Sequence, residues 1–271
     1  MLKIVPITPH IGAYIHGIDL ANCCEQNLGE VYNAFVTHQV IFLDNQSLSP
    51  EQHLKLAQRF GQLEPVHPFF PNVASAPQVS VIETTPGNAP MESYWHTDLT
   101  WRSKPSKSSL LHAQHIPNVG GDTIWCSMTA VFDSLDEEMK AKLRRLSATH
   151  SLVAFEGIPT EQVELDWHKQ LLKTAEANPP VVHPVVQVHP ETGKETLFIN
   201  EQFTRYVNEL ERKESDELLD QLFKIARRPE FQVRFKWKEN SLAIWDNRVT
   251  QHYAVIDYGD TPRKMHRVTV T

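Results

Sequence analysis

The chain has 271 residues and a formal net charge of −7 at pH 7. Hydrophobic residues make up 41% of it and charged residues 22%, which is ordinary for a folded globular domain and excludes a disordered chain. Because no run of Lys or Arg is longer than a pair, the chain lacks the basic face that phosphate backbones require, and we expect no nucleic-acid partner. We expect one domain over residues 1–271, a size that β barrels and sandwiches reach without splitting.

The N-terminal segment MLKIVPITPH has no apolar signal-peptide core, and no stretch approaches 18 uninterrupted apolar residues. We therefore expect no membrane partner. The three cysteines, of which Cys23 and Cys24 are adjacent and Cys126 lies in an apolar run, do not make a disulfide framework. These features predict a cytoplasmic protein.

The first half of the chain contains mostly strand-like runs around one clear helix signal. After the apolar run 40–43, Ser49 provides an N-cap, Pro50 follows at the first helical position, Gln52 completes a capping box, and Gly61 ends the helix. The proline-rich segment 64–78 has no regular period and is typical of a binding loop. Further strands are predicted at 79–83, 108–113 and 123–127.

The second half alternates helices with strands. A helix is predicted to begin near Ser134, with Glu137 as its capping-box partner, and another to span 214–226. Segment 153–182 has no firm period and is a candidate lid. Strands are predicted on both sides of a turn at 191–194, and at 231–237, 242–246 and 266–271. Because strands and helices do not alternate regularly, we expect a β core decorated by helices.

The segment YWHTDLTW, residues 94–101, places an imidazole and a carboxylate two positions apart. On an extended chain, residues i and i+2 share a face, so His96 and Asp98 would point the same way. Imidazole and carboxylate suit Fe(II), Mn(II) or Zn(II), and two histidines with one carboxylate leave three octahedral positions open. Since the pair alone is a common motif, a metal site needs a third ligand.

A candidate third ligand follows a strongly apolar strand in AIWDNRVTQHYAVIDY, residues 243–258. This strand ends at Trp245 and Asp246, and His252 comes shortly after it. We therefore predict that His96, Asp98 and His252 bind one metal ion.

Two arginines lie four positions apart in TPRKMHRVTVT, residues 261–271. Arg267 enters a Val/Thr strand, where we expect it to be buried on one face and to need an anionic partner. That partner is either a structural Asp or Glu, or the carboxylate or sulfonate of a small ligand, which a guanidinium binds bidentately.

Taken together, these motifs resemble the taurine dioxygenase (TauD/TfdA) family of Fe(II)- and 2-oxoglutarate-dependent dioxygenases. The separation of Asp98 and His252 by 153 residues (252 − 98 − 1) is typical of that family. Its markers here are GAYIHGIDL (12–20), HQVIFLDNQSLSPEQHLKLAQRFGQLEPVHP (38–68), WHTDLTW (95–101), GGDTIW (120–125), HPVVQVHPETGKETLFIN (183–200) and WDNRVTQHYAVIDY (245–258), followed by RKMHR (263–267).

The resemblance implies a mainly β protein with α decoration: a double-stranded β-helix (jelly-roll, cupin-like) core with flanking helices and a lid loop. It implies that His96, Asp98 and His252 bind Fe(II), which with 2-oxoglutarate and O2 carries out the reaction. It also implies that Thr123 and Arg263 hold the distal carboxylate of 2-oxoglutarate. Arg267 lies at the position near the substrate's sulfonate and next to the cosubstrate. The remaining implied substrate contacts are His67, Phe70, Leu99 and Phe203.

The sequence departs from taurine dioxygenases at the end of the pocket that holds the substrate's amine. Glu92 stands where those enzymes have an Asn four residues before the first iron-binding His, and Phe70 replaces a Tyr. A Ser-Phe pair is replaced around Phe155 and Glu156. A buried, unpaired carboxylate costs several kcal/mol or becomes neutral, so Glu92 favours a cationic substrate end unless it faces solvent.

We therefore expect a cytoplasmic dioxygenase of sulfur metabolism that hydroxylates a small, taurine-like organosulfonate and releases sulfite and an aldehyde with succinate and CO2. One alternative is the same chemistry on an alkyl sulfate ester or a small carboxylate without sulfur. Another is a cupin-like binding protein without turnover. As the family implies, we expect a homo-oligomer, either a dimer or a tetramer.

Overall fold

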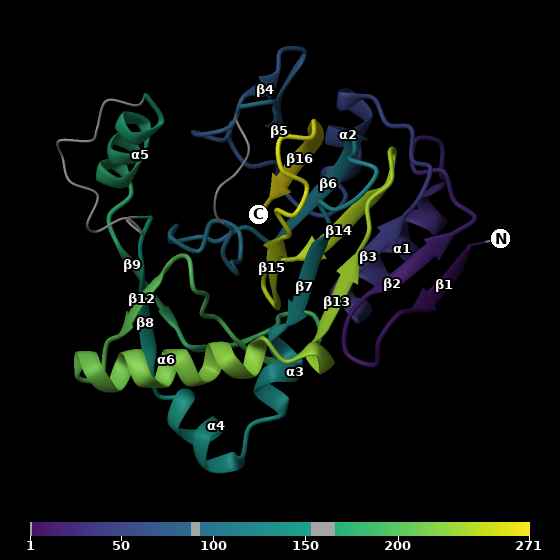
Figure 1. The fold of residues 1–271 in the computed structure, drawn as a ribbon. Coiled ribbons are helices and arrows are strands. Elements are labelled where there is room, and N and C mark those ends of the chain that lie inside the picture. Colours follow the sequence, from purple (N-terminus) through teal and green to yellow (C-terminus); the bar gives the residue numbers. More distant parts are fainter. Residues whose placement is uncertain (1, 88–92, 153–165) are drawn as a thin grey trace.

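The computed structural model describes residues 2–87, 93–152 and 166–271. Within these ranges the strands form one large sheet and three smaller ones (Figure 1). The large sheet has the order β1-β2-β3-β14-β6-β16-β5-β4 and is antiparallel except where β2 pairs with β3. The smaller sheets have the orders β13-β7-β15, β12-β8-β9 and β10-β11.

The strands are β1 (Lys3–Pro6), β2 (Ala13–His16), β3 (Val40–Leu43), β4 (Asn72–Val73), β5 (Ala76–Thr84), β6 (Ser108–His115), β7 (Thr123–Ser127), β8 (Ser147–His150), β9 (Val181–Pro184), β10 (Val186–Val188), β11 (Glu195–Leu197), β12 (Thr204–Val207), β13 (Gln232–Phe235), β14 (Leu242–Asp246), β15 (Thr250–Ala254) and β16 (Arg263–Val270). The helices are α1 (Glu25–His38), α2 (Pro50–Ala57), α3 (Met128–Asp133), α4 (Glu137–Leu143), α5 (Asp166–Ala177), α6 (Arg212–Ala226) and the short 3-10 helix η2 (Pro229–Phe231).

The large sheet packs against the β13-β7-β15 sheet across an aromatic core. Phe42 and Trp245 of the large sheet meet Trp125 and Phe235 of the small one, and all four are buried. Phe42 stacks on Phe235 with ring centroids 4.3 Å apart, and Trp125 meets Trp245 edge-on at 5.6 Å. Two facing sheets joined in this way form the double-stranded β-helix core expected from the sequence.

Helices cover the outer surfaces of this core. α1 and α2 pack on the other face of the large sheet through a second apolar cluster that includes Phe35 and Phe60. α3 and α6 pack against β11 and β12 through a third cluster, at the lower end in Figure 1. Because both faces of the large sheet are covered, its central strand β14 is buried along its whole length.

Most of the predicted elements are confirmed. β7 and β14 have the predicted bounds, and α2 has the predicted capping box between Ser49 and Gln52. The helix predicted to begin near Ser134 was placed wrongly. Asp136 caps α4 instead, because its carboxylate accepts the Met139 N–H, while Ser134 ends α3.

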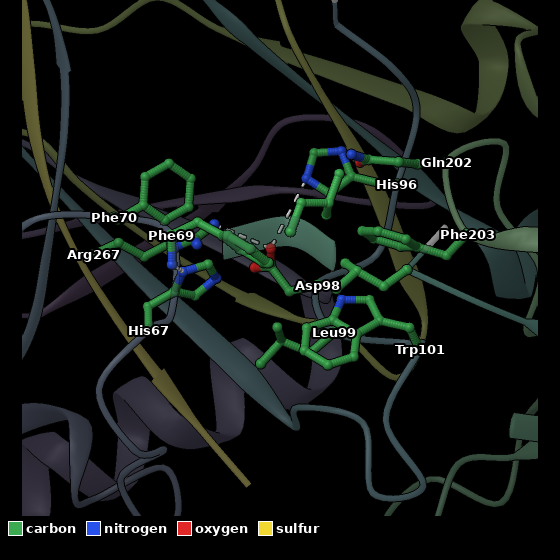
Figure 2. Close-up of a pocket in the computed structure, with 12 residues that line it drawn as sticks. His67, Phe69, Phe70, His96, Asp98, Leu99, Trp101, Gln202, Phe203 and Arg267 are labelled. Carbon is green, nitrogen blue, oxygen red and sulfur yellow. Dashed lines mark hydrogen bonds and ion pairs between the residues drawn. The ribbon is translucent and has the colours of Figure 1, made fainter. Parts of the chain in front are cut away.

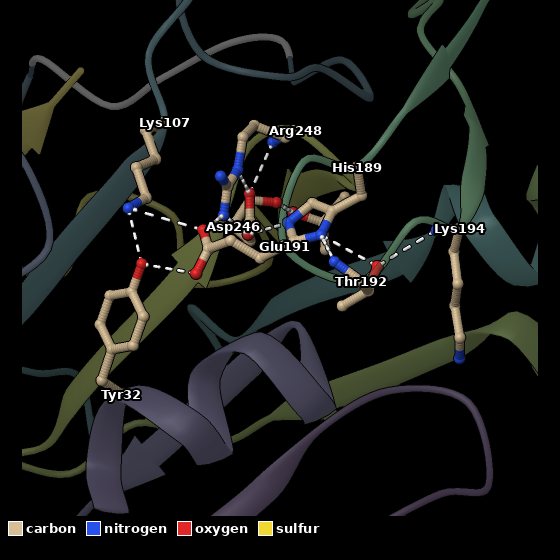
Figure 3. A network of polar contacts seen from close by, with 9 residues as sticks. Tyr32, Lys107, His189, Glu191, Thr192, Lys194, Asp246 and Arg248 are labelled. Carbon is tan, nitrogen blue, oxygen red and sulfur yellow. Dashed lines mark hydrogen bonds and ion pairs between the residues drawn. The ribbon is translucent and has the colours of Figure 1, made fainter. Parts of the chain in front are cut away.

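A polar network joins the turn between β10 and β11 to the end of β14 (Figure 3). Asp246 accepts hydrogen bonds from Arg248, and one of its oxygens lies 3.0 Å from His189 Nε2. Glu191 in the same turn pairs with Arg248 at 2.8 Å and accepts the Tyr32 hydroxyl of α1. Three separate segments are therefore fixed around the strand that precedes His252.

Candidate functional site

His96 and His252 come together through the backbone. The two residues form an isolated antiparallel bridge in which His96 N–H donates to the His252 carbonyl at 3.0 Å, and His252 N–H donates to the His96 carbonyl at 2.7 Å. Their rings lie 4.1 Å apart between centroids. His252 occupies the middle of β15, so this strand positions both imidazoles.

Asp98 begins the turn that follows this bridge. Its Oδ1 lies 3.9 Å from His96 Nε2, and the chain is extended at His96 but turns from Asp98 onward. The imidazole and the carboxylate therefore approach each other as the two-residue spacing predicted. Leu99, at φ +58°, holds a backbone conformation that residues other than glycine rarely adopt.

The side chains of His96, Asp98 and His252 form a set of metal-ligand type. One donor atom from each lies within 4.8 Å of the other two. His96 Nδ1 lies 2.9 Å from the Tyr94 carbonyl, which can only accept, so the proton is on Nδ1 and Nε2 offers its lone pair. Within the part of the chain that is described, buried His252 Nδ1 has no hydrogen-bond partner. Two imidazoles and one carboxylate fit a divalent transition metal.

The charges at this site also favour metal binding. Burial lowers the pKa of His96, and lowers that of His252 well below its ordinary value, so both rings are neutral. Burial alone would raise the pKa of Asp98, yet the Arg267 guanidinium and the hydrogen bond from Ser109 hold it well below its usual range. The site therefore offers deprotonated ligands at neutral pH.

A cavity of about 240 Å³ opens beside these three residues (Figure 2). In the view of Figure 2, Arg267, His67 and Phe70 lie on one side of Asp98, and Phe203 and Trp101 lie on the other. The polar lining residues are His67, His96, Asp98, Gln202 and Arg267. The apolar lining residues are Phe69, Phe70, Leu99, Trp101, Leu152, Leu171 and Phe203.

Arg267 marks the cationic end of the cavity. It is buried on β16, as predicted, and its Nη1 donates to Asp98 Oδ1 at 3.1 Å. Its Nε has no hydrogen-bond partner within the described ranges, and its guanidinium carbon lies 5.0 Å from the centre of the Phe70 ring. Of the two kinds of anionic partner expected from the sequence, the structure shows an aspartate of the protein itself, Asp98.

His67 lies beside Phe70 at this end, with 4.6 Å between ring centroids. Burial and the nearby Arg267 lower its pKa to about 3, so the ring is neutral. Its Nδ1 accepts the Phe69 N–H at 3.2 Å, which places the ring proton on Nε2. His67 is therefore a neutral hydrogen-bond donor.

Thr123 and Arg263 lie outside the lining of this cavity. The Thr123 hydroxyl is buried and accepts the Trp237 Nε1–H at 2.9 Å, so its own hydrogen remains available to an acceptor. Arg263 is only 7% exposed, and among the described residues it forms no ion pair and its Nε has no partner. Burial lowers the pKa of Arg263.

The absence of a side chain at Gly121 lets Arg263 pack closely against the segment that carries Thr123. Gly121 has φ +74°, and a Cβ at this position would lie 3.3 Å from Arg263 Nε. A buried guanidinium and a free hydroxyl donor on adjacent segments suit a carboxylate ligand.

Two groups of residues stand apart from the sequence predictions. Glu92, Phe155 and Glu156 lie outside the described residues, as does the part of the predicted lid at 153–165, whereas its remainder, 166–182, contains α5 and the start of β9. Sequence reasoning did not identify Ser109 and Asn247, which lie behind Asp98. Ser109 lies in a predicted strand and Asn247 in one of the family markers, but a single Ser or Asn carries no sequence pattern that indicates a contact to Asp98 or to a residue that holds it.

Comparison with known proteins gives a consistent result. The family model described as "Taurine catabolism dioxygenase TauD, TfdA family" matches residues 3–269. An alkylsulfatase of Acinetobacter baylyi is 35% identical over 273 residues, which cover 99% of this chain and 84% of the relative.

Two solved structures have the same fold. A putative alpha-ketoglutarate-dependent taurine dioxygenase from Burkholderia xenovorans is 32% identical with a TM-score of 0.82, covering 100% of this chain and 89% of that one. The structure of AAD-2 in complex with Mn(II) and N-oxalylglycine is 29% identical with a TM-score of 0.82, covering 100% of this chain and 97% of the other.

Proposed function

Because the chain belongs to the TauD/TfdA family of 2-oxoglutarate-dependent dioxygenases, we propose that it uses Fe(II) held by His96, Asp98 and His252 to hydroxylate a small organosulfonate. The observation that carries this proposal is the set of three deprotonated ligand atoms within 4.8 Å beside a cavity with a cationic end. When bound, the metal would supply, with 2-oxoglutarate and O2, the oxidising power for hydroxylation. The Mn(II) complex of AAD-2 supports a divalent metal in this fold.

Thr123 and Arg263 are proposed to hold the distal carboxylate of 2-oxoglutarate. The buried Arg263 lacks an ion-pair partner in the described part of the chain, and the Thr123 hydroxyl has a hydrogen to donate. A carboxylate between them would satisfy both groups.

Arg267 and His67 are proposed to bind the sulfonate of the primary substrate, with Phe70, Leu99 and Phe203 around its carbon chain. The free Arg267 Nε and the neutral, Nε2-protonated His67 supply donors at one end of the cavity. Hydroxylation of the carbon that bears the sulfonate gives an adduct that collapses to an aldehyde and sulfite.

An alkyl sulfate ester is the second candidate substrate, because the cavity wall away from Arg267 is apolar. Leu99, Trp101, Leu152 and Phe203 form one buried cluster there. Among the described lining residues, Asp98 is the single carboxylate, and it already pairs with Arg267. The described wall therefore suits an alkyl chain better than the ammonium of taurine, and the named activity of the Acinetobacter relative agrees with this candidate.

A panel of taurine, an alkylsulfonate, the matching alkyl sulfate and the matching carboxylate tests the substrate class. A sulfonate substrate predicts sulfite, and a sulfate ester predicts sulfate. A carboxylate predicts succinate formation without either anion. His96→Ala and Asp98→Ala should abolish substrate-dependent succinate formation, and unchanged turnover in either variant would refute the metal site.

The domain number, cellular location and oligomeric state of the protein are proposals. The match of the family model to residues 3–269 supports one domain over 1–271. Within the described ranges, no helix is both long and apolar enough to cross a membrane. A cytoplasmic location is proposed from the N-terminal sequence and the cysteine pattern, and a homodimer or homotetramer is proposed from the family resemblance.

A further inference from the structure

All three oxygen atoms of Asp98 accept hydrogen bonds from neighbouring side chains. The Ser109 hydroxyl donates to Asp98 Oδ2 at 2.6 Å, and Arg267 Nη1 donates to Oδ1 at 3.1 Å. The Ser106 hydroxyl donates to the Asp98 backbone carbonyl at 3.0 Å. The carboxylate and the backbone of Asp98 are thus each held by a serine hydroxyl.

Asn247 joins the two serines. Its Nδ2 donates to Ser106 Oγ at 3.1 Å and to Ser109 Oγ at 3.0 Å, while its Oδ1 accepts the Trp245 Nε1–H at 2.9 Å. The side chains of this group are at most 1% exposed. Both amide hydrogens of Asn247 are therefore used, and its oxygen is held in place by Trp245.

This arrangement sets the direction of each hydrogen bond. A serine hydroxyl has one hydrogen, and because Ser109 accepts from Asn247, that hydrogen is free to point at Asp98 Oδ2. Asp98 Oδ1 is left on the side of His96 Nε2, 3.9 Å away. Trp245 also packs its ring 4.9 Å from that of His252, so the same network contacts a second ligand.

We propose that Ser109 and Asn247 are positioning residues that orient the Asp98 carboxylate for the metal ion. This inference rests on the proposed metal site. Neither residue lines the cavity, so neither is placed to contact the substrate. Hydrogen bonds to a ligating carboxylate fix its orientation before the metal arrives, and their loss weakens metal binding.

The test measures Mn(II) binding to the metal-free protein, without substrate or turnover, from the electron paramagnetic resonance signal of free Mn(II). Ser109→Ala and Asn247→Ala should each raise the Mn(II) Kd about tenfold or more. The double variant should bind more tightly than the product of the two single effects predicts, since both residues act on the hydrogen bond from Ser109 to Asp98, while Asn247 also orients Ser106.

Ser108→Ala is the matched control. Ser108 is the adjacent residue of β6 and is also fully buried, but in the described part of the chain its hydroxyl has no hydrogen-bond partner. Removing this hydroxyl should change the Mn(II) Kd by less than about twofold. The comparison separates the loss of a buried hydroxyl on this strand from the loss of the contact to Asp98.

Thermal unfolding of each metal-free variant checks the fold. If Ser109→Ala does not fold, Ser109→Cys replaces it, because cysteine has the same shape as serine with a somewhat larger side-chain atom that donates only weakly. Folded Ser109 and Asn247 variants that bind Mn(II) as tightly as Ser108→Ala would overturn the positioning role. A wild-type protein that binds no Mn(II) would instead refute the proposed metal site.

Discussion

Replacing Arg263 with methionine should stabilise the protein without 2-oxoglutarate and abolish its response to that ligand. Arg263 is 7% exposed and has no ion pair among the described residues, and its guanidinium carbon lies 5.8 Å from the centre of the Tyr258 ring, so the burial of its charge is only weakly offset. Replacing buried ion pairs with apolar residues of similar volume is often neutral or stabilises proteins by about 1–4 kcal/mol, and a buried guanidinium without an ion-pair partner gains less from its charge than a pair does. We expect about 2 kcal/mol here, which corresponds to a rise in Tm of roughly 4 °C for a chain of this size.

The response to 2-oxoglutarate should change in the opposite sense. At a concentration of about 100 Kd, the ligand stabilises the Mn(II)-loaded wild type by about 2.7 kcal/mol. Hydrogen bonds to charged groups contribute roughly 1.5–3 kcal/mol each, so loss of two raises Kd at least about 100-fold. The same concentration then stabilises Arg263→Met by at most about 0.4 kcal/mol.

Scanning calorimetry with and without 2-oxoglutarate measures both effects. Arg234→Met is the control, because Arg234 is half exposed and pairs with Asp122 at 2.7 Å. It should keep the full response to the ligand. If Arg263→Met lowers the Tm of the ligand-free protein and keeps more than half of the wild-type response, the assignment of Arg263 to the cosubstrate is wrong.

Three further changes test other parts of the structure. Asp246→Asn should lower stability by about 3 kcal/mol at pH 7, because it breaks a buried charged network. Burial would raise the pKa of Asp246, but Arg248 and His189 lower it. The stability that the Asp246 carboxylate contributes is therefore present above about pH 4 and is lost as the pH falls further. Calorimetry from pH 7 to pH 2 should show a smaller fall in Tm for Asp246→Asn than for the wild type. Gly121→Ala should displace Arg263 and thereby raise the KM for 2-oxoglutarate at least about tenfold. Gly193→Ala is the control, because Gly193 also has a positive φ, +69°, but has open space around it; this variant should leave that KM unchanged. Phe203→Ala should lower kcat/KM for the best substrate about tenfold or more by removing an apolar wall, and an unchanged kcat/KM would show that Phe203 does not contact the substrate.

The sequence predicted the strands best where residue chemistry and period agreed. Apolar runs such as 242–246 are strands because they are buried on both faces. His96 and Asp98 were expected on one face of an extended segment, and they do approach each other, although the chain already turns at Asp98. α1 was not predicted, because its buried face consists of Val31, Ala34 and Phe35 among mostly polar residues.

The residues that hold Asp98 in place could not be predicted from the sequence for a different reason. Ser109 and Asn247 are 138 residues apart, and their contact depends on the pairing of β6 with β14. Nothing in the local sequence specifies that pairing. The ion pair between Arg267 and Asp98 likewise depends on where β16 lies in the large sheet.

The reciprocal backbone hydrogen bonds between His96 and His252 have a consequence for how such enzymes diversify. They set the spacing of the two imidazoles without using any side chain of the cavity wall. The wall residues Leu152, Leu171 and Phe203 come from parts of the chain between the two histidines, so they can be exchanged while the spacing of the imidazoles is kept. The substrate can therefore change through the wall residues while the two imidazoles, and with them the metal chemistry, stay in place. Directed evolution of this protein toward new substrates should target those wall segments first.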